Sequence, residues 1–199
     1  MSVLGELQPN KVFKYFEEIC SIPHGSRNLQ QISDYLVDFA KAHELKYRQD
    51  EDLNVIIWKD GSKGYEASEP VILQGHMDMV AVKEADCDKD MEKEGLDLEI
   101  NGDYISAKGT SLGGDDGIAV AYTLAVLDDE EMAHPPIEAI FTVNEEIGML
   151  GAATIDVSDL KGRLFMNMDS EDEGVFTVSC AGGASVICKI PYETETVNA

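Results

Sequence analysis

The stretch Val71-Ile72-Leu73-Gln74-Gly75-His76-Met77-Asp78-Met79-Val80 organises the rest of the chain. It has the pattern of a short apolar strand that leads directly into a histidine and an aspartate two residues apart. Because side chains alternate between faces along a strand, we expect His76 and Asp78 to point to the same side. A carboxylate beside a histidine can hold one ring nitrogen and leave the other free for a metal ion. For this stretch alone, a histidine with an ordinary place in the core or on the surface is the alternative.

Acidic residues follow two further apolar segments. Residues 137–143 are apolar and partly β-branched and lead into Glu145 and Glu146, and residues 164–168 lead into Asp169. In open α/β sheets, binding sites form at the carboxyl ends of the strands. We therefore expect these carboxylates to meet the histidine at one edge of a sheet.

A buried helix is predicted after the pair Gly113-Gly114. It starts with Asp115 and Asp116, and residues 118–127 are apolar on nearly every side, which is typical of a helix enclosed by protein. Two ionised carboxylates at its start need a counter-charge, and a metal cation supplies one. Helix capping is the alternative, but it explains one aspartate better than it explains both.

One imidazole and five carboxylates are thus candidates for a metal site: His76, Asp78, Asp115, Glu145, Glu146 and Asp169. This donor set suits zinc, manganese or cobalt, with no thiolate among the ligands. An aspartate that bridges two ions about 3.5–4 Å apart would give a two-metal hydrolase site. Adjacent glutamates point in different directions, so one of Glu145 and Glu146 can bind a metal while the other stays free as a base.

The remaining pattern predicts an α/β protein. Further elements are expected as helices over residues 10–20 and 29–39, strands over 53–59 and 70–74, a hairpin of 98–100 and 104–106 around Asn101-Gly102, and alternating strands over 175–199. We expect Asn28 to cap the second helix.

Composition and charge exclude several classes of protein. The formal net charge of -24 argues against nucleic acid or an anionic membrane surface as a partner. No apolar run approaches the roughly 18 residues that would span a bilayer. The first residues lack the basic and then apolar regions of a secretory signal, and the four scattered cysteines are typical of reduced thiols. These features predict a cytoplasmic protein.

Four motifs occur in a characteristic order and spacing: His76-Met77-Asp78, Gly114-Asp115-Asp116-Gly117, residues 144–148 (Asn-Glu-Glu-Ile-Gly) and residues 167–171 (Asn-Met-Asp-Ser-Glu). Together they resemble the co-catalytic zinc peptidases of the aminoacylase/carboxypeptidase family. Stretches such as residues 19–24 (Ile-Cys-Ser-Ile-Pro-His) and 109–113 (Gly-Thr-Ser-Leu-Gly) narrow the resemblance to the aminoacyl-histidine dipeptidases, also called Xaa-His dipeptidases or peptidase D. The resemblance covers essentially the whole chain.

The resemblance implies a fold and a ligand set. The fold would be a three-layer α/β/α catalytic domain with a mixed sheet. Two zinc ions would be bound, with His76 and Asp169 on one ion, Glu146 on the other, and Asp115 bridging both. Manganese or cobalt could replace zinc. The family also often has a cis peptide bond after the bridging aspartate, so we expect one between Asp115 and Asp116.

The resemblance further implies an activity, the hydrolysis of dipeptides, above all Xaa-His, by a metal-activated water. Asp78 would orient the His76 ring, and Glu145 would act as the general acid/base. A homodimer is possible, because family members are commonly dimers. Two other functions fit the same residues: a non-catalytic metal-binding remnant, and an amidohydrolase that acts on N-acyl amino acids.

The chain departs from the family in two respects. Asp116 stands where the dipeptidases usually have asparagine. Family members are also more than twice as long, and their second half supplies a histidine that completes the second zinc site. We therefore expect this chain to be the N-terminal portion of such an enzyme. In that interpretation, residues 1–180 belong to the catalytic domain, and residues 181–199 begin a truncated lid or dimerisation domain.

Overall fold

A computed structural model describes residues 2–170, 174–179, 182–184 and 186–195. The chain divides into two units, Met1–Asp169 and Ser170–Ala199. The first unit holds every helix and strand in the described part of the chain. In the second unit, the described residues form no helix or strand, and apolar side chains such as Phe176 and Val178 are exposed.

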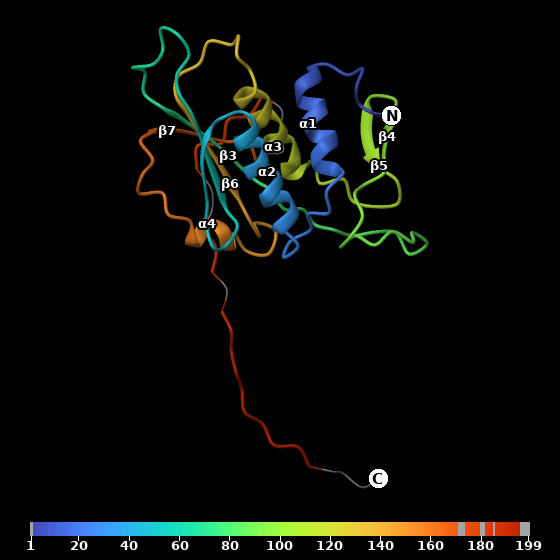
Figure 1. The fold of residues 1–199 in the computed structure, drawn as a ribbon. Helices are drawn as coiled ribbons and strands as arrows, with labels where there is room; N and C mark the ends of the chain where they lie inside the picture. The colour runs from blue at the N-terminus through green and yellow to red at the C-terminus, as the bar shows by residue number, and fades with distance from the viewer. Residues whose placement is uncertain (1, 171–173, 180–181, 185, 196–199) are drawn as a thin grey trace. The chain divides into compact units, whose positions relative to one another are not determined.

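A five-stranded mixed sheet forms the centre of the first unit, in the order β1-β2-β6-β3-β7 (Figure 1). The strands are β1 (Lys46–Gln49), β2 (Val55–Lys59), β3 (Val71–His76), β6 (Ile137–Thr142) and β7 (Leu164–Asn167). Neighbours among β1, β2 and β6 pair antiparallel, whereas β3 pairs parallel with both β6 and β7. The carboxyl ends of β3, β6 and β7 therefore lie at the same edge of the sheet.

Three helices lie on one side of this sheet (Figure 1), two of them in contact with its strands and the first packed against the third. They are α1 (Asn10–Cys20), α2 (Gln30–Ala42) and α3 (Gly114–Leu127). Their buried apolar residues form one cluster with alternate residues of the strands, among them Val55, Leu73 and Phe141. Burying one such aliphatic or aromatic side chain stabilises a fold by about 1.5–3 kcal/mol. This cluster fixes the start of α3 against the end of β3.

The opposite face of the sheet is covered in part by the chain that leads into β7. The buried Glu138 carboxylate of β6 accepts hydrogen bonds from the backbone N–H groups of Lys161 (3.0 Å) and Gly162 (2.9 Å). A Cβ at Gly162 would lie 2.8 Å from the Ile72 side chain, so the backbone there contacts β3 directly. This packing brings the start of β7 to the side of β3.

Two smaller elements complete the first unit. A hairpin of β4 (Leu98–Asn101) and β5 (Tyr104–Ala107) lies beyond α1 in Figure 1 and adds Leu98 and Ala107 to the core. The short helix α4 (Leu150–Thr154) follows β6. No helix in the described part of the chain is long and apolar enough to cross a membrane.

The predicted α/β class, with its mixed sheet, is confirmed, and the elements expected within residues 1–170 are present. Strand β1 and helix α4 were not predicted. The expected cap of the second helix is wrong, because α2 begins at Gln30 without a side-chain cap. Asn28 instead donates its side-chain amide to the backbone oxygen of Glu92 at 2.9 Å, a contact between segments far apart in the sequence.

The strands predicted over residues 175–199 are wrong for the described residues of that stretch, which form none. Alternating apolar residues suit a strand only where a neighbouring strand and an apolar layer receive them. Residue 171, the last of the fourth motif, lies outside the described residues, as do residues 172, 173, 180 and 181. The predicted domain boundary between residues 180 and 181 lies outside them as well.

Candidate metal centre

The sheet topology gathers the predicted site residues at one edge. His76 is the last residue of β3, Glu145 follows β6, and Asp169 follows β7. The start of α3 adds Asp115 beside the end of β3. Gly75 makes this approach possible, since a Cβ there would lie 2.9 Å from a carboxylate oxygen at the start of α3.

Three of these residues form a group with the spacing of a metal site. His76, Asp115 and Asp169 each offer one ligand atom, and these atoms lie within 4.8 Å of one another. His76 Nε2 lies 3.1 Å from Asp115 Oδ1. Two ligands of a tetrahedral zinc ion, each about 2.0–2.2 Å from the metal, lie roughly 3.4 Å apart. Both carboxylates are exposed, and the donor set and its spacing fit a divalent cation.

The ring of His76 is held from its other side. Its Nδ1 lies 2.9 Å from the backbone oxygen of Asp78 and 3.6 Å from a carboxylate oxygen of the same residue. A carbonyl can only accept a hydrogen bond, so Nδ1 carries a proton and donates it. Nε2 is then the nitrogen that faces the carboxylates, which is the arrangement of a metal-binding histidine.

The charge around His76 is strongly negative. Burial alone would lower the pKa of His76, but the carboxylates of Asp78, Asp116 and Glu145 outweigh burial and raise this pKa to about 9. In the metal-free protein near neutral pH, a proton on Nε2 therefore occupies the place that a cation would take. Metal binding and protonation compete for the same nitrogen.

The Asp78 carboxylate is fully buried and serves two other segments. Its Oδ2 accepts a hydrogen bond from Ser26 Oγ at 2.8 Å, and its Oδ1 accepts one from the backbone N–H of Glu145 at 3.0 Å. Burial opposes ionisation, yet His76 and these two donors together keep the pKa of Asp78 below its ordinary value. Asp78 therefore stays ionised and joins β3 to the segment that follows β6.

The two adjacent glutamates occupy different positions. Glu145 is partly buried, with its Oε2 4.0 Å from His76 Nε2. Glu146 is also partly buried but is not a member of the three-residue group. Burial, followed by the neighbouring carboxylates, raises the pKa of each glutamate above its ordinary value. An elevated pKa suits a group that must take up and release a proton near neutral pH.

Asp116 points away from this group and into the protein. Its side chain is buried, and its Oδ2 accepts a hydrogen bond from the backbone N–H of His76 at 3.1 Å. Burial, with a contribution from Asp169 and Asp115, raises the pKa of Asp116 to about 7. The peptide bond between Asp115 and Asp116 is cis, which confirms the expectation from the resemblance.

Sequence reasoning missed Ser26 and gave no role to Asn144, although Asn144 stands in one of the quoted motifs; both residues hold this arrangement together. Asn144 accepts a hydrogen bond from the backbone N–H of Arg27, 117 residues away in the sequence. The only signal for Ser26 was its position next to the quoted stretch that ends at His24. A serine in a loop has no local pattern that reveals a buried carboxylate partner.

Comparison with known proteins finds similarity to peptidases. No family model matches the sequence. The chain is homologous to the cytosol non-specific dipeptidase of Escherichia coli, with 39% identity over 199 residues that cover 100% of this chain and 41% of that protein. It is 40% identical to the aminoacylhistidine dipeptidase of Vibrio alginolyticus, whose crystal structure matches 86% of this chain and 35% of that chain with a TM-score of 0.83.

A more distant structure shows the same fold. The tripeptidase from Staphylococcus aureus matches 84% of this chain and 45% of its own chain, with a TM-score of 0.68 and 23% sequence identity. The chain thus spans less than half the length of each of these relatives. The expected homology to dipeptidases and the expected peptidase fold are confirmed.

Proposed function

We propose that this chain carries the larger part of the active site of a zinc-dependent dipeptidase that hydrolyses peptides of the Xaa-His type. The observation that carries the proposal is the convergence of His76, Asp115 and Asp169 within 4.8 Å. The homology to a dipeptidase over the whole chain supports it. Since the chain spans 41% of that relative, the activity of the complete enzyme remains a proposal.

Two zinc ions are proposed for the complete site, and manganese or cobalt suits the same donors. His76 and Asp169 would hold one ion, Glu146 the other, and Asp115 would bridge them. The Asp115 side chain is 65% exposed and directs one oxygen toward His76, so its second oxygen is available to a second ion. Glu146 lies in the segment after β6, beside the group that forms the first site.

Zinc, when bound, lowers the pKa of a water molecule and polarises the scissile carbonyl group. Glu145 would take the proton of this water and return it to the departing amine. Its raised pKa and its position 4.0 Å from His76 support this role. Asp78 would keep both residues in place, because its backbone oxygen holds the His76 ring and its carboxylate holds the Glu145 backbone.

Substrate recognition is proposed to depend on a lid domain that begins near residue 181. We infer a cytosolic location from the name of the Escherichia coli relative. A homodimer remains a prediction, as does the domain boundary after residue 180.

The proposal is tested by assaying the zinc-loaded chain with an Xaa-His dipeptide and with an N-acyl amino acid. We expect slow hydrolysis of the dipeptide above the rate in buffer. Glu145→Gln should reduce this rate by roughly 10²–10⁴-fold and leave the bound zinc nearly unchanged, because general acid/base catalysis contributes that much. Glu146→Gln is the matched control: because Glu146 is proposed to hold the second ion, this variant should lose zinc bound beyond the first ion and keep the zinc held by His76, Asp115 and Asp169.

Other outcomes would point to the alternatives. Zinc binding without any hydrolysis would favour a non-catalytic metal-binding domain, and preference for the N-acyl amino acid would favour an amidohydrolase. Loss of zinc in Glu145→Gln would mean that the two glutamates have the opposite roles.

A further inference from the structure

Residues 24–27, between α1 and α2, form a strap that lies along the chain just after β3. The backbone N–H of Met79 donates to the oxygen of His24 at 3.2 Å, and the N–H of Ser26 donates to the oxygen of Met79 at 3.1 Å. Gly25 and Met79 form a parallel bridge between these bonds. The strap therefore pairs with the residues that follow His76 through one isolated bridge beside the sheet.

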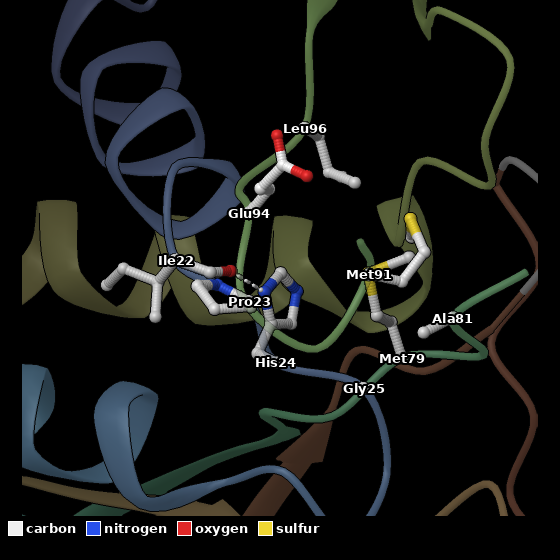
Figure 2. A pocket seen from close by; sticks show the side chains of 9 residues that line it. All are labelled: Ile22, Pro23, His24, Gly25, Met79, Ala81, Met91, Glu94 and Leu96. Atoms are coloured by element: carbon white, nitrogen blue, oxygen red, sulfur yellow. Dashed lines mark hydrogen bonds between the residues drawn. The ribbon is translucent and has the colours of Figure 1, made fainter. Parts of the chain in front are cut away.

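Close packing fixes the start of the strap. The His24 ring is buried, with Nδ1 2.6 Å from the backbone oxygen of Ile22, and Figure 2 shows it beside Met79 and Gly25. A Cβ at Gly25 would lie 2.6 Å from the Cβ of Ala81, so a larger residue would push the strap away. The cavity next to the ring measures about 10 Å³, room for about one water molecule.

The strap contacts the metal centre through the hydroxyl group of Ser26. This hydroxyl donates to Asp78 Oδ2 at 2.8 Å, while the other carboxylate oxygen accepts from the N–H of Glu145. The Asp78 side chain is 0% exposed, so these protein donors replace the water that an exposed carboxylate would bind. With one donor on each oxygen, the plane of the carboxylate is fixed.

The next residue of the strap holds the segment after β6. The backbone N–H of Arg27 donates to Asn144 Oδ1 at 2.8 Å. Arg27 and Asn144 both adopt positive φ angles, 73° and 53°, in which few residues other than glycine and asparagine are common. The strap thus binds the site at two adjacent points, Asp78 and the residue before Glu145.

We propose that Ser26 is a positioning residue of the metal centre, whose hydroxyl group fixes the Asp78 carboxylate and, through it, both the His76 region and the start of the Glu145 segment. This inference rests on the function proposed above. Without the hydroxyl group, one oxygen of a buried carboxylate has no donor. The carboxylate then turns away from its present position, and the backbone of Glu145 loses its fixed partner.

Variants at Ser26 test this inference with two independent measurements on the 199-residue chain. The first is the zinc dissociation constant, measured by competition with a chelator, and the second is the hydrogen-exchange rate of the Glu145 amide in the metal-free protein. We expect Ser26→Ala to weaken zinc binding by up to about 10-fold, the lower end of the roughly 10–100-fold that loss of a direct partner of a metal ligand costs, because Ser26 acts on His76 only through Asp78. It should also speed exchange of the Glu145 amide, although Ser26 does not touch that amide.

Ser26→Thr keeps the hydroxyl group, so its zinc dissociation constant and its Glu145 exchange rate should both be close to the wild-type values. A role of Ser26 in packing alone predicts no such recovery. Ser33→Ala is the matched control. Ser33 is 0% exposed and donates to the backbone oxygen of Leu53 at 2.7 Å, so this control removes a buried hydroxyl group that bonds neither Asp78 nor Glu145. It should change neither measurement. If Ser26→Ala does not fold, Ser26→Cys replaces it, because a thiol of similar shape is only a weak donor.

Wild-type zinc affinity together with unchanged Glu145 exchange in Ser26→Ala would overturn the inference. Equal weakening of zinc binding by Ser33→Ala would also overturn it, since general destabilisation would then explain the loss. If the wild-type chain binds no zinc, the proposed function fails. Glu145 exchange still decides whether Ser26 positions this segment.

Discussion

The candidate metal centre has a buried half and an exposed half, and the protein holds them differently. The side chains of His76 and Asp78 are 1% and 0% exposed, and their polar atoms meet protein partners. The side chain of Asp115 is 65% exposed and that of Glu145 is 30% exposed. The fold therefore orients the imidazole and its support in advance, and we expect a bound cation to set the final positions of the more exposed carboxylates.

Like charges add to the effect of burial at the two glutamates of the site. Carboxylates that share a small volume repel one another, which favours their protonated forms. The raised pKa values of Glu145 and Glu146 show this effect, after burial as the larger cause. A divalent cation removes the repulsion, so metal binding and the order of this half are coupled.

The largest expected difference between the two halves is the loss of stability when one carboxylate is removed from each, Asp78 from the buried half and Asp115 from the exposed half. Asp78→Ala leaves the Ser26 hydroxyl and the Glu145 N–H without their partner, which should destabilise the metal-free protein by about 1–3 kcal/mol. Asp115→Ala removes an exposed side chain and should change stability by less than about 0.5 kcal/mol. Urea unfolding of the metal-free variants measures both values.

The zinc affinity of these two variants should not follow the order of their stability. Asp115→Ala removes a direct ligand and should weaken zinc binding at least as much as Asp78→Ala does, despite its small effect on stability. If both variants unfold at the same urea concentration, the distinction between the two halves does not hold.

A smaller, pH-dependent effect is expected at Asp116. The pKa of this buried carboxyl group is about 7 in the folded metal-free protein, against about 3.9 in an unfolded chain. Between these values the folded state binds more protons, so the contribution of Asp116 to stability falls as the pH rises from about 4 to about 7. Above about pH 7, Asp116 carries a buried negative charge, which an asparagine at this position would not carry.

Asp116→Asn should therefore stabilise the metal-free protein at pH 8. The expected gain in Tm is roughly 2–4 °C, the shift that 1 kcal/mol produces in a protein of this size. The asparagine oxygen can still accept the hydrogen bond from the His76 N–H. Thermal unfolding at pH 8 and pH 4 measures the effect, which should vanish at pH 4. An equal gain at both pH values would show that ionisation of Asp116 is not its cause.

The sequence predicted the part of the site that depends on local pattern. Apolar runs that end in His76, Glu145 and Asp169 indicated strand ends, and a continuous apolar run indicated the buried helix after Asp115. Because β3, β6 and β7 are parallel, their carboxyl ends meet at one edge. A strand pattern and the rule for α/β sheets were enough to predict that these residues converge.

The parts that were missed or wrong depend on contacts between distant segments. Ser26 meets Asp78 across 52 residues, and Asn28 bonds to Glu92 instead of capping its own helix. No local sequence pattern indicates that Ser26 or Asn28 has a partner so far away in the sequence. The residues after 174 have a strand pattern without a partner strand in the described part of the chain, and a strand needs such a partner to form.

The zinc content of the folded chain, measured after loosely held metal has been removed, tests the central claim most directly. We predict about one zinc per chain, since His76, Asp115 and Asp169 supply one ligand group. His76→Ala should abolish this binding while circular dichroism shows a folded protein. A folded wild-type chain that retains no zinc would contradict the account.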